Sequence, residues 1–145
     1  LELDRSQQGI RWSSPDRWHI TVRFFEHADM GQLKQLFFQM EAQETVGRLG
    51  PRVSRLGGQI LIVPVGGLSV LAEQVRAATA PQGSNDQLPF VGHITLGRMK
   101  EIGSAELEGT AIEGAFRVDQ LLLVESRIDS GGHAHTVVGS QPLLQ

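Results

Sequence analysis

One short pattern, His-Ile-Thr followed by an apolar residue, occurs twice in the sequence and constrains its fold more than any other feature. It begins at His19 and again at His93, and both copies lie in runs rich in β-branched residues. Such runs predict β-strands. Because the predicted order of strand, helix and strands also recurs around each copy, the sequence indicates two similar α+β halves whose motif strands line a common cleft.

Hydrophobic periodicity and turn residues divide the rest of the chain into short elements. The first motif lies in a predicted strand at residues 18–25, and Asp29 is a candidate N-cap for an amphipathic helix over residues 32–48. Glycine pairs at positions 57–58 and 131–132 predict hairpin turns. Further strands are predicted at residues 52–56, 59–65, 91–98, 116–128 and 136–138, a second helix at residues 68–78, and one helical turn at residues 104–108.

Size and composition indicate one soluble domain over residues 1–145. A net charge of -3 argues against salt-driven coating of nucleic acid, so any nucleic-acid substrate is engaged locally. The absence of cysteine excludes disulfides and thiolate metal sites. No apolar run approaches the ~18 residues of a membrane span, and the N-terminal residues do not resemble a signal peptide. We therefore expect a cytoplasmic monomer with no membrane partner.

The two motifs would each present a polar face if they form strands, because side chains alternate between the two faces of a strand. The first motif then places His19, Thr21 and Arg23 on one face and apolar residues on the other. The second places His93 and Thr95 together in the same way. These two faces concentrate two titratable groups and two hydroxyls.

Two further residues near the motifs are candidates for binding substrate. Arg98 follows the second motif, but strict alternation puts it on the face opposite His93 unless the strand bends near Gly97. For Arg98, as for Arg23, a solvated or salt-bridged side chain is the alternative to phosphate binding. Phe90 precedes the second motif and is a candidate for stacking on a base, with core packing as the alternative.

A pair of histidines suits acid and base catalysis at phosphorus, because histidine exchanges protons near neutral pH. In an in-line displacement, a neutral imidazole takes a proton from water while a charged imidazole gives one to the leaving oxygen. The hydroxyls of Thr21 and Thr95, together with an arginine, would donate to the non-bridging phosphate oxygens. A single histidine on a strand is more often a surface or core residue, but the duplicated pattern favours catalysis by His19 and His93.

Other motifs in the chain do not indicate a cofactor. His133 and His135 have the spacing of a metal pair, but no carboxylate cluster accompanies them and they lie at a predicted hairpin tip. The glycine pairs fit neither the dinucleotide-binding nor the P-loop pattern. We expect no metal and no cofactor.

The sequence resembles the two-histidine (2H) phosphoesterase superfamily, in particular the bacterial RNA 2',3'-cyclic phosphodiesterases that are also called 2'-5' RNA ligases. The resemblance spans nearly the whole chain and rests on RWSSPDRWHITVRFFEHAD at residues 11–29, PFVGHITLGR at residues 89–98 and FRVDQLLLVES at residues 116–126. It implies a bilobal α+β fold, with two pseudo-symmetric antiparallel-sheet lobes, outer helices and a central cleft. Relatives begin with a further strand and helix, so the resemblance implies that an N-terminal piece is missing from this chain.

The resemblance also implies an activity. It is the hydrolysis of 2',3'-cyclic phosphates on RNA ends to 2'-phosphomonoesters, with 2'-5' ligation as the reverse reaction. His19 would be the proton donor and His93 the proton acceptor. Two alternatives remain open on the sequence: a phosphodiesterase of small cyclic nucleotides, and a module that binds a nucleotide phosphate without turnover.

Overall fold

The computed structural model describes residues 9–83, 89–100, 107–129 and 132–145. The chain forms two compact units, and each unit is assembled from three separate stretches of sequence. Unit 1 comprises Leu1–Val22, Val46–Ser69 and Pro89–Phe116. Unit 2 comprises Arg23–Thr45, Val70–Leu88 and Arg117–Gln145. Both His-Ile-Thr motifs therefore belong to unit 1.

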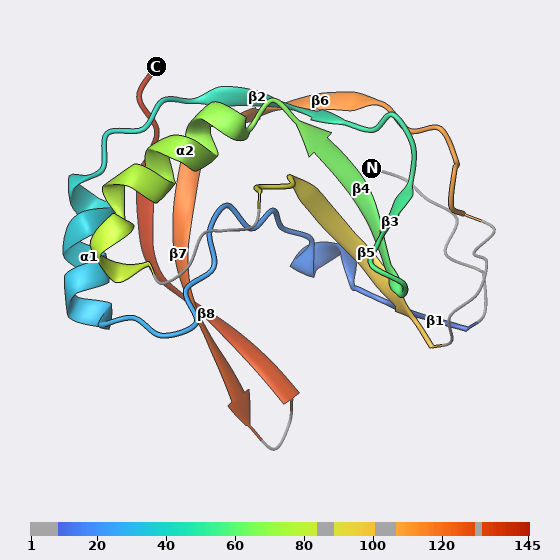
Figure 1. Ribbon diagram of the computed structural model, residues 1–145, viewed down its shortest axis with the longest axis horizontal. Coiled ribbons are helices and arrows are strands. Elements are labelled where there is room, and N and C mark those ends of the chain that lie inside the picture. The colour runs from blue at the N-terminus through green and yellow to red at the C-terminus, as the bar shows by residue number, and fades with distance from the viewer. Residues whose placement is uncertain (1–8, 84–88, 101–106, 130–131) are drawn as a thin grey trace. The chain divides into compact units, whose positions relative to one another are not determined.

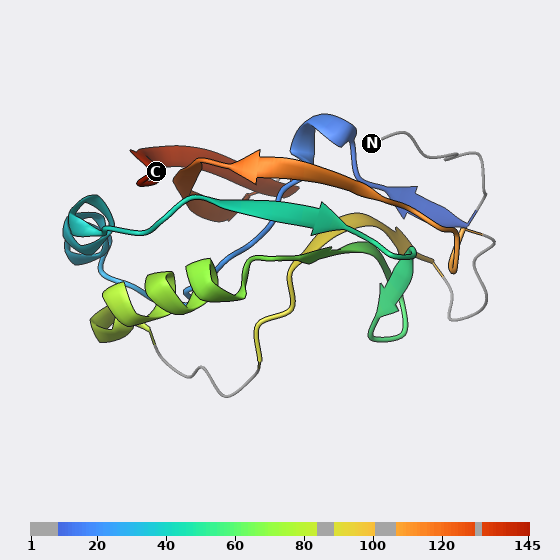
Figure 2. The same cartoon turned by 90° about the horizontal axis from the view of Figure 1, so that it is seen from above.

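The main element of unit 1 is an antiparallel sheet in the order β1-β5-β4-β2-β6, with β3 also paired to β4. Figure 2 shows β2 and β4 running side by side. The short helix η1 (Pro15–Arg17) follows β1. The strands are β1 (Ile10–Trp12), β2 (Thr45–Leu49), β3 (Ser54–Leu56), β4 (Ile60–Gly66), β5 (His93–Met99) and β6 (Gly114–Val118).

The core of unit 1 explains why β4 is the most apolar strand of the chain. It pairs with other strands along both edges, and Leu61, Ile62, Val63 and Val65 are all buried, so both of its faces are covered and few polar side chains are needed. Alternate residues of β4 and β5 enter one hydrophobic cluster, against which Trp12 and Trp18 pack. The buried members of the cluster are Ile10, Val53, Leu61, Val63, Leu96 and Met99.

The described part of unit 2 contains the helices α1 and α2, the short helix η2 (Ala80–Gln82) and a long hairpin (Figure 1). The helices are α1 (Met30–Gln39) and α2 (Ser69–Ala78), and the hairpin strands are β7 (Gln120–Asp129) and β8 (Gly132–Pro142). Helix α1 packs closely on β8, because a Cβ at Gly139 would come within 3.2 Å of the rings of Phe37 and Phe38. The predicted N-cap is confirmed, since the Asp29 side chain accepts a hydrogen bond of 2.9 Å from the Gln32 amide.

The end of the first predicted helix was wrong. Helix α1 stops at Gln39, and residues 45–49 form strand β2 instead. The predicted helix includes the β-branched pair Thr45-Val46, which fits a strand better. Gly47 also suits the strand, because a Cβ there would lie 2.6 Å from the ring of Phe116.

The strand predicted at residues 18–25 is absent from the structure, which gives this segment no helix or strand beyond the end of η1. Strand β5 pairs with β1 along one edge, where Trp12 lies opposite Gly97, and it pairs with β4 along the other edge. A β-branched run indicates an extended backbone, but a strand also needs a pairing partner. The prediction that Arg23 shares a strand face with His19 therefore fails.

The remaining elements match the prediction more closely. The β3–β4 hairpin, helix α2, strand β5 and the β7–β8 hairpin all form where the sequence indicated. The predicted strand at residues 116–128 is divided at Asp119 into β6 and β7, and its partner β8 is longer than expected. The helical turn predicted at residues 104–108 falls largely outside the described residues.

Candidate active site

The second motif lies at the start of β5, where the backbone is tightly held. The amide of Val65 on β4 donates a 2.8 Å hydrogen bond to the carbonyl of Gly92. A Cβ at Gly92 would lie only 2.4 Å from the Val65 carbonyl, so the close approach of the two strands requires glycine. The imidazole of His93 then follows, half-buried, with its Nδ1 2.7 Å from the carbonyl oxygen of Val91.

The first motif follows η1, which orients its histidine in the same manner. Pro15 occupies the first position of η1, and its carbonyl accepts a hydrogen bond of 3.2 Å from the Trp18 amide. The Trp18 side chain packs against the core of unit 1 and so anchors the next residue. The exposed imidazole of His19 places its Nδ1 2.9 Å from the carbonyl oxygen of Arg17.

The two histidines thus share one arrangement: in each, Nδ1 contacts the backbone carbonyl two residues earlier. A carbonyl oxygen only accepts, so Nδ1 carries the proton in this hydrogen bond. Nε2 is then the nitrogen that exchanges a proton, as a base when the ring is neutral and as an acid when it is charged. A backbone carbonyl thus fixes one ring nitrogen in both His19 and His93.

Strand β5 contains a β-bulge directly after the second motif. In the ladder with β4, Thr95 pairs with Ile62 and Gly97 pairs with Leu61, so Leu96 is an extra residue on β5. The Leu96 side chain is fully buried in the core of unit 1. An extra residue of this kind shifts the alternation of side chains beyond it by one position.

The bulge brings Arg98 to the face that carries His93 and Thr95. On β4, Arg98 pairs with Ile60 and His93 pairs with Pro64. Ile60 and Pro64 are separated by an even number of positions. Paired residues point to the same face, and so do residues an even number of positions apart. Arg98 therefore shares a face with His93, as the sequence allowed only if the strand bent in this region.

The other predicted site residues fall in different surroundings. Thr21 is exposed in unit 1, and Phe90 is half-buried, with its ring 3.5 Å from where a Cβ on Gly92 would lie. Arg23 belongs to unit 2, where its Nη1 donates hydrogen bonds of 2.8 Å to the Arg76 carbonyl and to Oγ1 of Thr79.

Those contacts place the Arg23 guanidinium at the C-terminal end of α2, where positive charge complements the helix dipole. It also lies over the ring of Phe25, with Cζ 5.0 Å from the ring centre. These contacts occupy the guanidinium of Arg23, although they are not the solvated or salt-bridged state that was given as the alternative to phosphate binding. We therefore leave it out of the proposed site.

Sequence reasoning missed one basic residue on this face. Arg11 lies directly opposite Arg98 in the β1–β5 ladder, so the two side chains point the same way. Nothing in the sequence gives the pairing of β1 with β5, and β1 was not predicted. The alternation of side chains along β1 would have shown only that Arg11 and Trp12 point to opposite faces.

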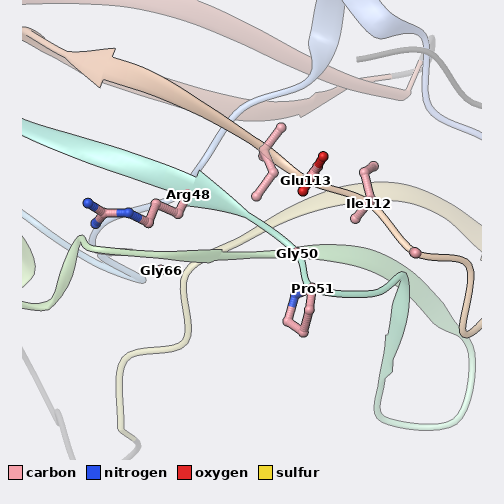
Figure 3. Close-up of a pocket in the computed structure, with 8 residues that line it drawn as sticks. Arg48, Gly50, Pro51, Gly66, Ile112 and Glu113 are labelled. Atoms are coloured by element: carbon pink, nitrogen blue, oxygen red, sulfur yellow. The ribbon is translucent and has the colours of Figure 1, made fainter.

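Unit 1 also contains a cavity of about 540 Å³, shown in Figure 3. Among the residues that the structure describes, no predicted site residue lines it, and the charged residues of its lining are Arg48 and Glu113. Because it lacks histidine, we place the candidate site at the two motifs rather than in this cavity. The other lining residues are Leu49, Gly50, Pro51, Gly66, Ala111 and Ile112.

No group of three or more histidine, cysteine, aspartate or glutamate residues is arranged to hold a metal ion in the described part of the chain. No helix among the same residues is both long enough and apolar enough to cross a membrane.

The α+β fold matches solved structures over nearly the whole chain. E. coli LigT complexed with NADP+ superposes with a TM-score of 0.76 at 22% identity, covering 95% of this chain and 83% of LigT. LigT complexed with 3'-AMP gives 0.75 at 21% identity, with the same coverage. The protein TT0787 of Thermus thermophilus gives 0.72 at 20% identity, covering 96% and 85% of the two chains.

A solved structure described as a phosphoesterase gives a TM-score of 0.72 at 23% identity and covers 94% of this chain and 83% of its own. No protein-family model and no curated protein sequence matches the chain. The resemblance read from the sequence is thus confirmed at the level of the fold.

Proposed function

We propose that this chain hydrolyses the 2',3'-cyclic phosphate at the end of an RNA to a 2'-phosphomonoester, using His19 and His93. The observation that carries the proposal is the shared arrangement of the two imidazoles, each with Nδ1 held by the carbonyl two residues earlier. The fold supports it, because LigT and a phosphoesterase have the same fold. LigT structures with 3'-AMP, ATP and NADP+ support a nucleotide as ligand.

In the proposed reaction, Nε2 of neutral His93 takes a proton from water as the water oxygen attacks phosphorus. The bond from phosphorus to O3' breaks, and charged His19 gives its Nε2 proton to O3'. The products are a 2'-phosphate and a free 3'-hydroxyl. The hydroxyls of Thr21 and Thr95 donate to the non-bridging oxygens, where negative charge gathers in the transition state.

The test is hydrolysis of a short RNA that ends in a 2',3'-cyclic phosphate, with the product identified by mass and by sensitivity to phosphatase. Wild-type protein should form the 2'-phosphate, while His19→Ala and His93→Ala should each lose at least about 10²-fold in kcat/KM. His135→Ala is the matched control, because His135 is exposed on β8 of unit 2.

Three other results would point elsewhere. Turnover confined to cyclic mononucleotides would favour a phosphodiesterase of small nucleotides. Binding of a nucleotide 2'-phosphate without turnover would favour the binding module. Wild-type rates in both single variants would show that the two histidines are not the acid and base.

A further inference from the structure

Two opposite charges line the cavity of unit 1 without meeting each other. Arg48 belongs to β2, and Glu113 directly precedes β6 (Figure 3). Both residues are exposed. Among the residues that the structure describes, neither side chain takes part in an ion pair or a hydrogen bond, and the two do not pair with each other. Both charges therefore remain available to a bound molecule.

The chemistry of the two groups defines what they would bind. A guanidinium such as that of Arg48 binds a carboxylate through two parallel hydrogen bonds. An ionised carboxylate such as that of Glu113 only accepts hydrogen bonds, and it accepts the strongest ones from a cation such as an ammonium group. Together the two groups match a molecule that carries one anionic and one cationic end.

The cavity also has apolar walls. Leu49 and Ile112 line it and are half-buried, since both pack against the core of unit 1. Pro51 adds a rigid ring to the lining. Small-molecule sites have volumes of about 300–1,000 Å³ and combine apolar walls with a few polar groups. The cavity, at about 540 Å³, has both properties, so its ligand should have an apolar body.

Backbone contacts hold the walls of the cavity together. The Ile112 amide donates a 2.9 Å hydrogen bond to the Pro51 carbonyl, and the Gly50 amide donates one of 2.9 Å to the Pro64 carbonyl on β4. Gly50 has a φ of 105°, and a Cβ there would collide with the Ile112 carbonyl oxygen, so this close approach requires glycine. The cavity is thus preformed, which lowers the entropic cost of binding.

Gly66 leaves space beside the guanidinium of Arg48. The two residues pair in the β2–β4 ladder, so a side chain at position 66 would point to the same face as Arg48. No described atom lies within 4 Å of the place where a Cβ on Gly66 would be, and the φ of Gly66 is outside the left-handed region. A larger residue would therefore fill this side of the cavity without strain.

We propose that this cavity binds a small zwitterion with an apolar body, namely a short apolar peptide with free ends. Arg48 binds its carboxylate, and Glu113 binds its ammonium group. The walls at Leu49 and Ile112 contact its apolar side chains. The site is independent of the proposed reaction, because neither His-Ile-Thr motif contributes to its lining.

The experiment compares four probes by isothermal titration calorimetry. Leucyl-leucine carries both charges and an apolar body, N-acetyl-leucyl-leucine lacks the ammonium charge, leucyl-leucine amide lacks the carboxylate, and glycyl-glycine lacks the apolar side chains. Wild-type protein should bind leucyl-leucine at least about 10-fold more tightly than each of the other three, because each of them loses one charge-assisted or apolar contact.

Three variants assign the contacts to residues. Arg48→Gln should weaken leucyl-leucine by about 10-fold and leave the amide unchanged, since the amide has no carboxylate to lose. Glu113→Gln should do the same for leucyl-leucine and leave the N-acetyl form unchanged. Gly66→Val should weaken leucyl-leucine without removing a charge. Arg127→Gln, at an exposed residue of β7 in unit 2, is the control and should change no dissociation constant.

The site is overturned if wild-type protein binds none of the probes or binds all four equally. Equal binding of leucyl-leucine and its N-acetyl form would reveal a plain anion site and would overturn the role of Glu113. The assignment also fails if Arg48→Gln weakens the amide as much as leucyl-leucine. Thermal unfolding of each variant separates loss of binding from loss of fold, and the two charge variants, both at exposed residues, decide the result if Gly66→Val does not fold.

Discussion

Pro64 lies directly opposite His93 in the ladder between β4 and β5. The Pro64 carbonyl accepts a 2.9 Å hydrogen bond from Gly50 on the far side of β4, while the next residue, Val65, donates toward β5. Pro64 and His93 are therefore a non-hydrogen-bonded pair, the kind in which side chains come closest. The missing amide hydrogen of proline costs the β4–β5 ladder nothing here, and its rigid ring stands beside the imidazole.

Pro64→Ala should loosen the position of the His93 ring. We expect kcat/KM for the cyclic phosphate substrate to fall by about 10-fold with the fold retained, since a small misplacement of a reacting group is costly. Steady-state kinetics and circular dichroism are the measurements. Pro142→Ala, at an exposed residue of β8 in unit 2, is the matched control. Unchanged kinetics in Pro64→Ala would show that the pairing does not position His93.

Arg11→Glu should stabilise the fold. An opposite charge facing Arg98 then replaces a like charge, so the free energy of unfolding should rise by about 0.2–1 kcal/mol. Urea denaturation measures this effect. A less stable variant would mean that the two arginines do not repel each other in the free protein.

Ser14→Ala should raise the pKa of the Asp16 carboxyl. The Ser14 hydroxyl donates a hydrogen bond to this carboxylate and, together with the backbone and Arg17, holds its pKa below the ordinary value of 3.8. A lowered pKa stabilises the fold above the unfolded-state pKa, and this contribution is lost as pH falls through the folded-state pKa. Carbon-13 NMR titration of the carboxyl should give a higher midpoint in the variant. An unchanged midpoint would show that the hydrogen bond is absent in solution.

Leu96→Ala tests the bulge. Leu96 is fully buried in the core of unit 1, so its truncation should lower the free energy of unfolding by about 2–5 kcal/mol. Val70→Ala, at a side chain of α2 that is 71% exposed, should change it by less than about 0.5 kcal/mol. Equal effects in the two variants, measured by urea denaturation, would contradict the burial of the bulge residue.

Local patterns predicted those elements whose stability is largely local. The Asp29 cap, the turn at residues 57–58 and the apolar run of β4 each carry their own signal, and each is found in the structure. The segment at residues 18–25 shows the limit, because its β-branched and aromatic residues indicate an extended backbone but cannot supply a pairing partner. The helix that was extended to residue 48 fails for the converse reason, since β2 forms by pairing with β4.

The candidate site was predictable as a list of residues but not as an arrangement. The histidine and threonine positions follow from the repeated motif. The side on which Arg98 lies does not, because one bulged residue, Leu96, reverses the alternation. The position of Arg11 opposite Arg98 depends on the register between β1 and β5, which sequence periodicity does not specify.

The decisive measurement is the pH dependence of kcat/KM for RNA ending in a 2',3'-cyclic phosphate, between about pH 5 and 9, in wild type, His19→Ala and His93→Ala. Because one imidazole must be charged and the other neutral, the wild-type profile should be bell-shaped. Each variant should lose most of the rate, and the remaining activity should lack one limb. A flat wild-type profile, or bell-shaped profiles of wild-type height in both variants, would contradict paired catalysis by His19 and His93.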